Sequence, residues 1–359
     1  MKADESRGAM RVVLEAASLS LSSGGLERYT SELSLALARC FPADEFVLTS
    51  DQPFSMPPGA PPNLRRGGGP RNSAERRWWL WGLEREGRRL HADVIHGPDF
   101  SVPYLRFRPS VMTLHDLSPW IDPRWHHDAA RVKWRTPVLL GLGIATMVVT
   151  PSESVRKQAI DRFRMNPDRV VAVPEAAAPW LAPLKTDPRQ PYFLFVGTLE
   201  PRKNLPALVE AWRQVRRDHD IDLILAGRRR ADAPELAPEP GLHLAGEVPD
   251  SELAPLYSGA LAVVNPSYYE GFGLPVLEAM QCGACVIASR GLWETGGDAA
   301  VYADGPAQLA QAMRQAATNP DWLAERRARS LTRAREFSWE RTARLTYQVY
   351  EEARRRGAY

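Results

Sequence analysis

Two glutamates that lie eight positions apart, Glu270 and Glu278, are the residues of this sequence best placed to do chemistry. They bracket the run EGFGLPVLE, whose glycines, Gly271 and Gly273, would let the backbone approach a ligand closely. Pro275 fits the first helical position, so Glu278 is expected in the first turn of a helix whose free amides attract a phosphate. The run therefore predicts an anion pocket with two carboxylates. The alternative is a glutamate that only complements the helix dipole, beside a solvated loop glutamate.

A basic pair, Arg202 and Lys203, follows the apolar run 192–196 in the sequence VGTLEPRKN. Ligands of open α/β sheets bind beyond the carboxyl ends of strands, where these two cations would neutralise phosphate charge. The alternative is an exposed basic pair at a helix start, which is unfavourable against the helix dipole.

Gly25 and His115 are weaker candidates, each close to the end of an expected strand. The pair Gly24-Gly25, in SSGG, opens a helix and suits a close phosphate contact, but it lacks the GxGxxG spacing and could be a simple turn. His115 ends the strand expected over residues 110–115, and a histidine bonded to neighbouring backbone is an equal alternative.

No set of residues has convincing metal-site spacing. The acidic pair in 220–222 precedes a strand, where a solvated turn is favoured. Cys282 and Cys285 have redox spacing, but they lie at a helix end and no second pair exists for zinc. The run 126–128, His-His-Asp, lacks the spacing of a helical zinc site. We therefore expect no metal and no other cofactor.

Short apolar runs alternate with helical patterns and must position these candidates. Several runs are apolar at consecutive positions, which is typical of parallel sheets covered by helices on both faces. The alternation predicts α/β units with right-handed crossovers. Strands are expected over 11–17, 46–49, 93–96, 110–115, 147–150, 170–173, 192–196, 222–226, 242–245, 261–264, 286–288 and 300–302.

The length of 359 residues suits two domains. Residues 174–191 contain five prolines without clear periodicity and are interpreted as the linker. We predict an N-terminal domain over 1–177, joined by the last helix over 340–359, and a C-terminal domain over 178–339. Both are expected to be doubly wound, Rossmann-like parallel sheets.

The composition, 44% hydrophobic and 25% charged, is that of a globular chain, and no apolar run reaches the length of a membrane span. The net charge of +3 gives no reason to expect a nucleic acid partner. Three cysteines and the absence of a signal-peptide pattern at the start predict the cytoplasm.

The charge is concentrated in residues 64–91, which hold eight arginines and three glutamates around Trp78, Trp79 and Trp81. An arginine-rich stretch with indoles can lie on an anionic membrane, so peripheral contact with the inner membrane face is a hypothesis. The alternative is that the tryptophans pack on the N-terminal sheet and the arginines are solvated.

Taken together, the motifs resemble the retaining glycosyltransferases of the B-type fold, specifically glycosyltransferase family four. The series runs through nearly the whole chain: the glycine loop, His-Asp at a strand end, VGTLEPRKN, AGEV and EGFGLPVLEAMQCGACVIAS. The resemblance implies two domains facing a cleft, with the acceptor on the N-terminal side and the donor on the C-terminal side. It also fits a last helix that crosses back to the N-terminal domain.

The resemblance implies transfer of a sugar, with retention of configuration, from a nucleotide-diphosphate-sugar to a glycan or lipid-linked saccharide, in surface polysaccharide or lipopolysaccharide assembly. Glu278 would bind the ribose and Lys203 the diphosphate. Glu270 would meet the donor sugar as nucleophile or as electrostatic support. The backbone amides of Phe272, Gly273 and Leu274 would contact the donor sugar and its phosphates together with Glu270.

The resemblance also places the nucleotide base near Val248, an amide of Gly25 at the donor, and His115 against the transferred sugar. Relatives often carry an arginine where this chain has Thr198, a role that Arg202 would take over. The role of Glu175 stays open. A sugar-nucleotide epimerase, a phosphorylase and a non-catalytic or regulatory nucleotide-binding partner of the same fold are the alternatives.

Overall fold

The computed structural model describes residues 8–21, 24–105, 107–126 and 129–357. Its contacts divide the chain into two compact units. The first comprises Met1–Leu117, Asp128–Glu175 and Trp339–Tyr359, and the second comprises Ser118–His127 and Ala176–Ser338. Its position in the chain predicts that the segment Ser118–His127 belongs to the N-terminal domain, but its contacts assign it to the second unit.

The first unit contains one sheet of seven parallel strands in the order β3-β2-β1-β4-β5-β6-β7. The strand β3 was not expected, because two of its three residues are exposed arginines and it has no apolar run. The strands are β1 (Arg11–Glu15), β2 (Glu45–Thr49), β3 (Leu64–Arg66), β4 (Val94–Gly97), β5 (Ser110–Thr113), β6 (Met147–Thr150) and β7 (Val170–Ala172).

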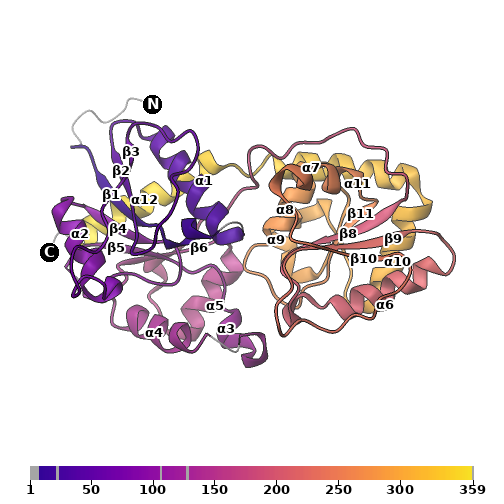
Figure 1. The fold of residues 1–359 in the computed structure, drawn as a ribbon, viewed down its shortest axis with the longest axis horizontal. Coiled ribbons are helices and arrows are strands. Elements are labelled where there is room, and N and C mark those ends of the chain that lie inside the picture. Colours follow the sequence, from indigo (N-terminus) through magenta and orange to yellow (C-terminus); the bar gives the residue numbers. More distant parts are fainter. Residues whose placement is uncertain (1–7, 22–23, 106, 127–128, 358–359) are drawn as a thin grey trace. The chain divides into compact units, whose positions relative to one another are not determined.

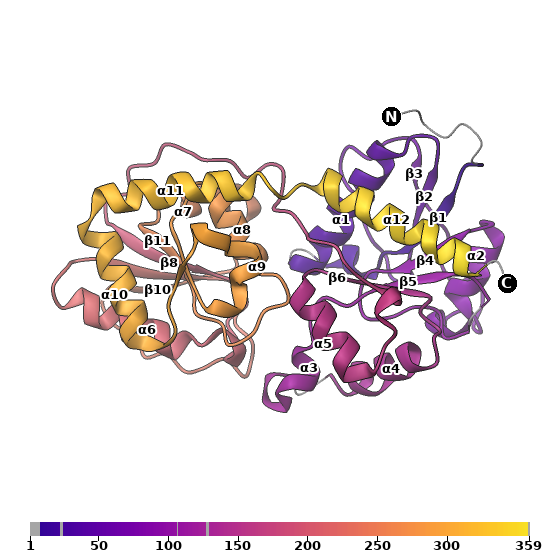
Figure 2. The ribbon, with the colours of Figure 1, turned by 180° about the vertical axis from the view of Figure 1, so that it is seen from behind.

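Two long helices pack together in the first unit, α1 (Gly25–Cys40) and α12 (Trp339–Gly357). Figures 1 and 2 show the yellow α12 running beside the indigo α1. One face of α12, which includes Ala343 and Tyr350, is buried. The Tyr350 hydroxyl lies 2.6 Å from Nδ1 of His96 on β4. The last helix is thus part of the first unit, as expected.

Shorter helices complete the first unit. They are η1 (Ala17–Ser20), the π-helical turn η2 (Trp78–Gly82), α2 (Leu83–Arg89), α4 (Ala130–Gly141), α5 (Glu153–Phe163) and η4 (Pro167–Arg169). Two further short helices, α3 (Ser118–Ile121) and η3 (Pro123–Trp125), lie in the inserted segment and belong to the second unit. None of the helices in the described part of the chain is long and apolar enough to cross a membrane.

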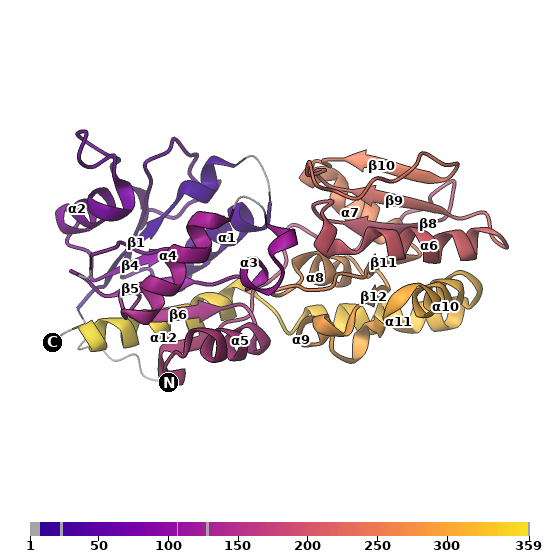
Figure 3. The same ribbon diagram turned by 90° about the horizontal axis from the view of Figure 1, so that it is seen from below.

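The second unit contains a sheet of six parallel strands in the order β10-β9-β8-β11-β12-β13. Figure 3 shows most of these strands one above another in that order. The strands are β8 (Tyr192–Val196), β9 (Asp222–Ala226), β10 (Leu242–Gly246), β11 (Ala262–Asn265), β12 (Val286–Ala288) and β13 (Val301–Tyr302).

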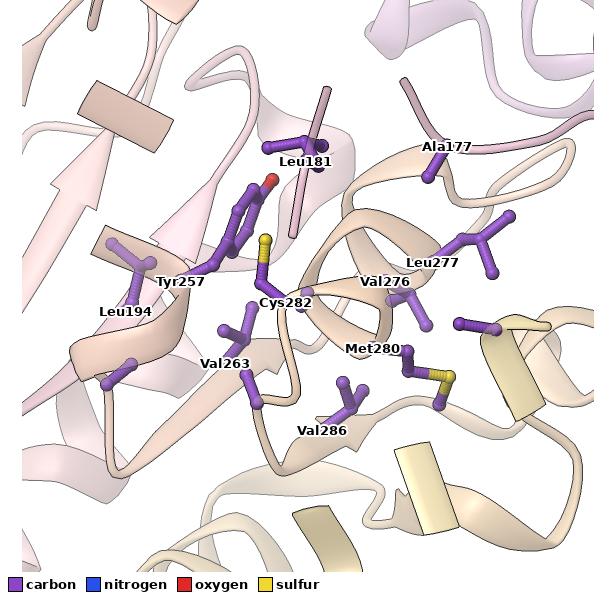
Figure 4. Close-up of a cluster of buried hydrophobic side chains, with 14 of the residues drawn as sticks. Ala177, Leu181, Leu194, Tyr257, Val263, Val276, Leu277, Met280, Cys282 and Val286 are labelled. Carbon is purple, nitrogen blue, oxygen red and sulfur yellow. The ribbon is translucent and has the colours of Figure 1, made fainter. Parts of the chain in front are cut away.

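Successive strand residues of the second unit point to opposite faces, and each face has its own apolar core. On β8, Phe193 and Phe195 join the core under α6 (Leu205–Arg216) and α10 (Gly305–Thr318). Leu194 joins the other core, drawn in Figure 4, which includes α7 (Asp250–Gly259) and α8 (Leu274–Gln281). The remaining helices are η5 (Pro201–Lys203), η6 (Arg290–Leu292), α9 (Trp293–Gly296), η7 (Gly297–Ala299) and α11 (Pro320–Ala334).

Both sheets reverse their strand order beside their first strand, β1 or β8, which is the doubly wound arrangement. The predicted fold class is therefore confirmed. In such sheets the loops after the two strands that flank the reversal part from each other and leave room for a ligand. These loops follow β1 and β4 in the first unit, and β8 and β11 in the second.

The proline-rich segment 174–191 forms no helix or strand, and the structure describes all of it. It is nevertheless fixed at its centre. Ala178 and Leu181 are buried against α8, as Figure 4 shows for Leu181, and both carbonyls accept hydrogen bonds from Gln281 Nε2 at 2.8 Å. The prolines therefore mark a connection that packs onto the second unit.

The tryptophans of segment 64–91 differ in their surroundings. Trp78 is buried with Val13 and Val47 on the N-terminal sheet, Trp79 is half-buried, and the Trp81 side chain is 39% exposed. The packing alternative is therefore correct for Trp78.

Candidate active site

The candidate donor residues of the second unit lie at its strand-order reversal. Arg202 and Lys203 form the end of η5 just after β8, and Glu270 lies in the loop between β11 and α8. The two loops are joined by a main-chain hydrogen bond from Tyr268 N to Arg202 O of 3.0 Å. The fold thus brings together residues that are nearly seventy positions apart in the sequence.

Glu270 is the centre of a buried ion cluster. Its Oε1 accepts hydrogen bonds from Lys203 Nζ at 2.5 Å and from Ser267 Oγ at 2.8 Å. Its Oε2 accepts from Arg202 Nη1 at 2.8 Å. Arg202 is 9% exposed and Lys203 is 7% exposed, so the alternative of an exposed basic pair is wrong.

The cluster fixes the charge of Glu270. Burial by itself raises the pKa of this carboxyl, but the charges of Lys203 and Arg202 outweigh burial and lower the pKa to about 2. The carboxylate is therefore ionised at every physiological pH, and both its oxygens are engaged.

A second layer of charges holds Arg202. Glu200 Oε1 accepts from Arg202 Nη2 at 2.7 Å, and Glu200 Oε2 accepts from Arg230. Arg230 also bonds Asp232 Oδ2 at 2.7 Å. Sequence reasoning missed Glu200, Arg230 and Asp232. The available signal was the run of three arginines, 228–230, just after β9, whose backbone pairs with Leu199 beside Glu200.

Glu278 lies on α8 and is buried, with its Oε2 accepting a hydrogen bond of 2.9 Å from the Tyr257 hydroxyl. The helix begins at Leu274, one residue before Pro275, so Glu278 belongs to its second turn and not to the first. Gly273 caps this helix with a φ of +91°, and a Cβ there would lie 2.2 Å from Leu292 Cδ2. Position 273, between the amides of residues 272 and 274, therefore accepts only glycine.

Val248, expected near the nucleotide base, is half-buried and packs against the core of the second unit. It follows β10, whose last residue, Gly246, accepts a main-chain hydrogen bond of 2.6 Å from Gly227. Its contact with a base stays a prediction.

In the first unit, His115 lies two residues beyond the end of β5. Its Nε2 is 2.7 Å from Pro98 O and its Nδ1 is 3.2 Å from Glu175 Oε1. Burial by itself lowers the pKa of His115, but Glu175 and Asp99 raise it above the ordinary value. The alternative of a histidine bonded to neighbouring backbone is therefore correct for His115, which also contacts a carboxylate. Glu175 is thus the carboxylate that lies against this imidazole and favours its protonated form.

Gly25 is the first residue of α1 and follows Gly24, whose φ of +126° is suited to glycine. The two serines before them, at positions 22–23, lie outside the described residues. Glu15, which sequence reasoning missed, ends β1 nearby in the chain and is buried. Burial raises its pKa to about 7, and Asp51 and Asp99 add to the effect. A charged residue at the end of an apolar strand was the available signal.

The discounted motifs have ordinary partners. Asp222 pairs with Arg216 at 2.8 Å, and burial raises the pKa of the Cys282 and Cys285 thiols to about 12. His126 Nε2 lies 2.7 Å from Ser118 Oγ, while positions 127–128 lie outside the described residues. In the described part of the chain, no group of three or more His, Cys, Asp and Glu side chains is placed to hold a metal ion.

Two parallel, doubly wound sheets in one chain form the arrangement known as the B-type glycosyltransferase fold. Solved structures agree: sucrose-phosphate synthase from Thermosynechococcus elongatus (TM-score 0.74, 21% identity, 96% of this chain and 99% of that one) and HepE from Anabaena in complex with UDP and glucose (TM-score 0.69, 15% identity, 96% and 100%).

The family follows from the sequence comparisons. Residues 23–179 match the model of Glycosyltransferase Family 4, and residues 190–319 match that of Glycosyl transferases group 1. The chain is 33% identical over 283 residues to the O-antigen chain mannosyltransferase B of Escherichia coli, a match that covers 72% of this chain and 74% of that protein. The chain therefore belongs to glycosyltransferase family 4.

The buried ion cluster makes a prediction for stability. Lys203→Met and Glu270→Gln should each destabilise the second unit by about 3–5 kcal/mol, because each leaves a buried charge without its partner. The double variant should lose less than the sum of the two. Chemical unfolding of the four proteins measures this coupling.

The matched control is the exposed pair Glu325–Arg329 on α11, where the same cycle should give about 0.3–0.5 kcal/mol. Equal coupling in the two cycles would show that burial does not strengthen the Lys203–Glu270 pair.

The His115–Glu175 pair predicts a pH dependence. The pair stabilises the first unit fully below pH about 6.5, and this contribution is lost as the pH rises through the raised pKa of His115. In Glu175→Gln the pKa of His115 should fall, because burial then dominates. A histidine NMR titration measures it, with the exposed His91 as internal reference. An unchanged His115 titration in the variant would contradict the pairing.

Proposed function

We propose that the chain transfers a sugar from a nucleotide-diphosphate-sugar to a glycan or lipid-linked saccharide, with retention of configuration. The observation that carries this proposal is the buried Lys203–Glu270–Arg202 cluster beside the amide end of α8. The family membership supports the reaction class. The similarity to an O-antigen mannosyltransferase favours a mannosyl group and an acceptor in surface polysaccharide assembly.

The cluster suits the charge that develops on the leaving group. As the glycosidic bond breaks, negative charge grows on the diphosphate, and donors that are already oriented stabilise it at little reorganisation cost. Lys203, Arg202 and the amides of residues 272–274 are such donors. Because these groups can balance the diphosphate charge, we propose a reaction that does not need a metal.

Glu270 acts as electrostatic support rather than as nucleophile in this proposal. Its pKa of about 2 makes it a weak base, and its oxygens are already bonded to Lys203, Arg202 and Ser267. Such a carboxylate is better suited to balance positive charge at the reacting sugar carbon than to form a bond to it. Glu278, with the Tyr257 hydroxyl as partner, would hold ribose hydroxyls.

In the first unit, we propose that His115, charged through Glu175, contacts the transferred sugar. Gly25, at the amide end of α1, would add a donor to the phosphates. These roles follow the family pattern at matching positions.

The donor assignment predicts a loss of nucleotide binding. Glu278→Ala and Lys203→Ala should each weaken the affinity for the preferred nucleoside diphosphate by at least about 30-fold, since each removes a buried charged contact of about 2 kcal/mol or more. Thermal shift across UDP, GDP and other diphosphates first identifies the base, and calorimetry then gives the affinities.

The exposed Glu252→Ala on α7 is the matched control and should bind as the parent does. Unchanged affinity in both site variants would remove the donor assignment. Release of nucleoside diphosphate that depends on an acceptor separates a transferase from an epimerase or a non-catalytic partner.

We also propose that the first unit contacts an anionic membrane from its cytoplasmic side, through segment 64–91 and the adjoining α4. On α4, Trp134 is 64% exposed, Val138 46% and the following Leu142 70%, at helical spacing on one face. The helix carries basic but no acidic residues. Arg135 of α4 lies over the Trp79 ring at 5.9 Å, which joins the helix to the segment.

The membrane proposal is tested with vesicles. The chain should cosediment more strongly with vesicles containing anionic lipid than with neutral ones, and Trp134→Ser with Leu142→Ser should weaken this at least about tenfold, since two exposed apolar side chains are lost. The control is Trp293→Ser, an exposed tryptophan of the second unit. Equal binding to neutral and anionic vesicles would remove the proposal.

A further inference from the structure

A pocket of about 660 Å³ lies in the second unit and plays no part in the donor assignment above. It is formed by four stretches of chain: the inserted segment Ser118–His127, the start of η5, the loop after β9 and the loop after β11. Its lining residues are Asp122, Arg124, Trp125, Pro201, Asp232 and Tyr268.

Two aromatic side chains line this pocket. Tyr268 is 65% exposed although it lies on a loop whose neighbours are buried or half-buried. Trp125 is held in place, because its ring stacks on Tyr269 at 6.3 Å with an interplanar angle of 19° and its carbonyl accepts from Arg230 Nη2 at 3.0 Å. A fixed indole and an exposed phenol ring are suited to the C–H face of a sugar ring, which is attracted to the negative face of an aromatic ring.

The polar groups of the pocket are suited to hydroxyls. The Arg124 guanidinium donates hydrogen bonds to the Asp122 carboxylate, with 2.6 Å between Arg124 Nη2 and Asp122 Oδ2. The pair therefore presents a hydrogen-bond acceptor beside a donor. Asp232 gives one oxygen to Arg230, while none of the described residues donates to the other. Both cations are already matched by carboxylates, so the pocket does not favour a phosphate.

The pocket is built on the same backbone as the donor cluster. Pro201 directly precedes Arg202, and Tyr268 N donates to Arg202 O at 3.0 Å. Arg230 contacts Trp125 and Asp232 on the pocket side and Glu200 on the cluster side. A sugar ring in the pocket therefore lies against the loops that hold Glu270.

We propose that this pocket binds a sugar ring of the acceptor saccharide, with Tyr268 and Trp125 as its stacking surface and Asp232 as a hydroxyl acceptor. This inference rests on the proposed sugar transfer. It adds the second unit, which holds the donor cluster, to the acceptor-binding surface.

Binding and turnover test the inference separately. Saturation-transfer NMR with α-linked mannobiose should show contact with the parent protein, contact that persists in Tyr268→Phe and is lost in Tyr268→Ala. With a mannobiose acceptor, Tyr268→Ala should raise the acceptor KM about tenfold, the effect of losing one aromatic stacking contact. Tyr268→Phe keeps the ring and is the matched variant. A thermal shift with the preferred nucleoside diphosphate confirms that Tyr268→Ala is folded.

The outcomes are distinct. The pocket assignment would be overturned if Tyr268→Ala had the same mannobiose contact and the same acceptor KM as the parent. That result would leave the proposed sugar transfer intact. The absence of mannobiose contact in the parent, with transfer to other saccharides still observed, would overturn it as well. Failure of the parent to transfer sugar from any nucleotide donor would instead overturn the proposed function.

Discussion

The interaction on which the second unit depends is the salt bridge of Glu270 with Lys203 and Arg202. A buried carboxylate is tolerable only while cations compensate it, and the cations are equally costly without the carboxylate. Glu200 and Arg230 extend the same requirement to the loop after β9. The loops after three strands are therefore joined to one another by these ion pairs.

The same requirement determines what the site can bind. Lys203, Arg202 and Arg230 are balanced by three carboxylates, so the cluster carries no net charge before a ligand arrives. In the proposed reaction a diphosphate would share cations that Glu270 already holds, and the amides at the start of α8 would supply the extra attraction. Such sharing favours a ligand whose negative charge increases during reaction, because the donors are oriented in advance.

The sequence predicted those features of the structure whose cause lies within one short stretch of residues, and it did not predict those that depend on contacts between distant stretches. The strands β6, β8, β9 and β12 have the predicted bounds, because their apolar runs are continuous. Glu270 and Lys203 were recognisable from their motifs. Arg230 and Asp232 were not, because their importance arises where the ends of β8 and β9 lie side by side. The sequence also could not predict that Ser118–His127 belongs to the second unit. That assignment depends on contacts between distant parts of the chain, such as the stacking of Trp125 on Tyr269.

Segment 64–91 shows why counting charges is a poor guide to a surface. Its three glutamates are all buried, and they bind arginines of their own segment and Arg108, so part of the apparent positive charge is neutralised internally. Trp78 is likewise committed to the sheet. What remains available for a membrane is Trp81, the exposed arginines of the segment such as Arg76 and Arg77, and the exposed face of α4, where apolar and basic side chains occur without acidic ones. The apolar part of the membrane hypothesis therefore comes mainly from α4, a helix whose role the charge pattern of the sequence did not indicate.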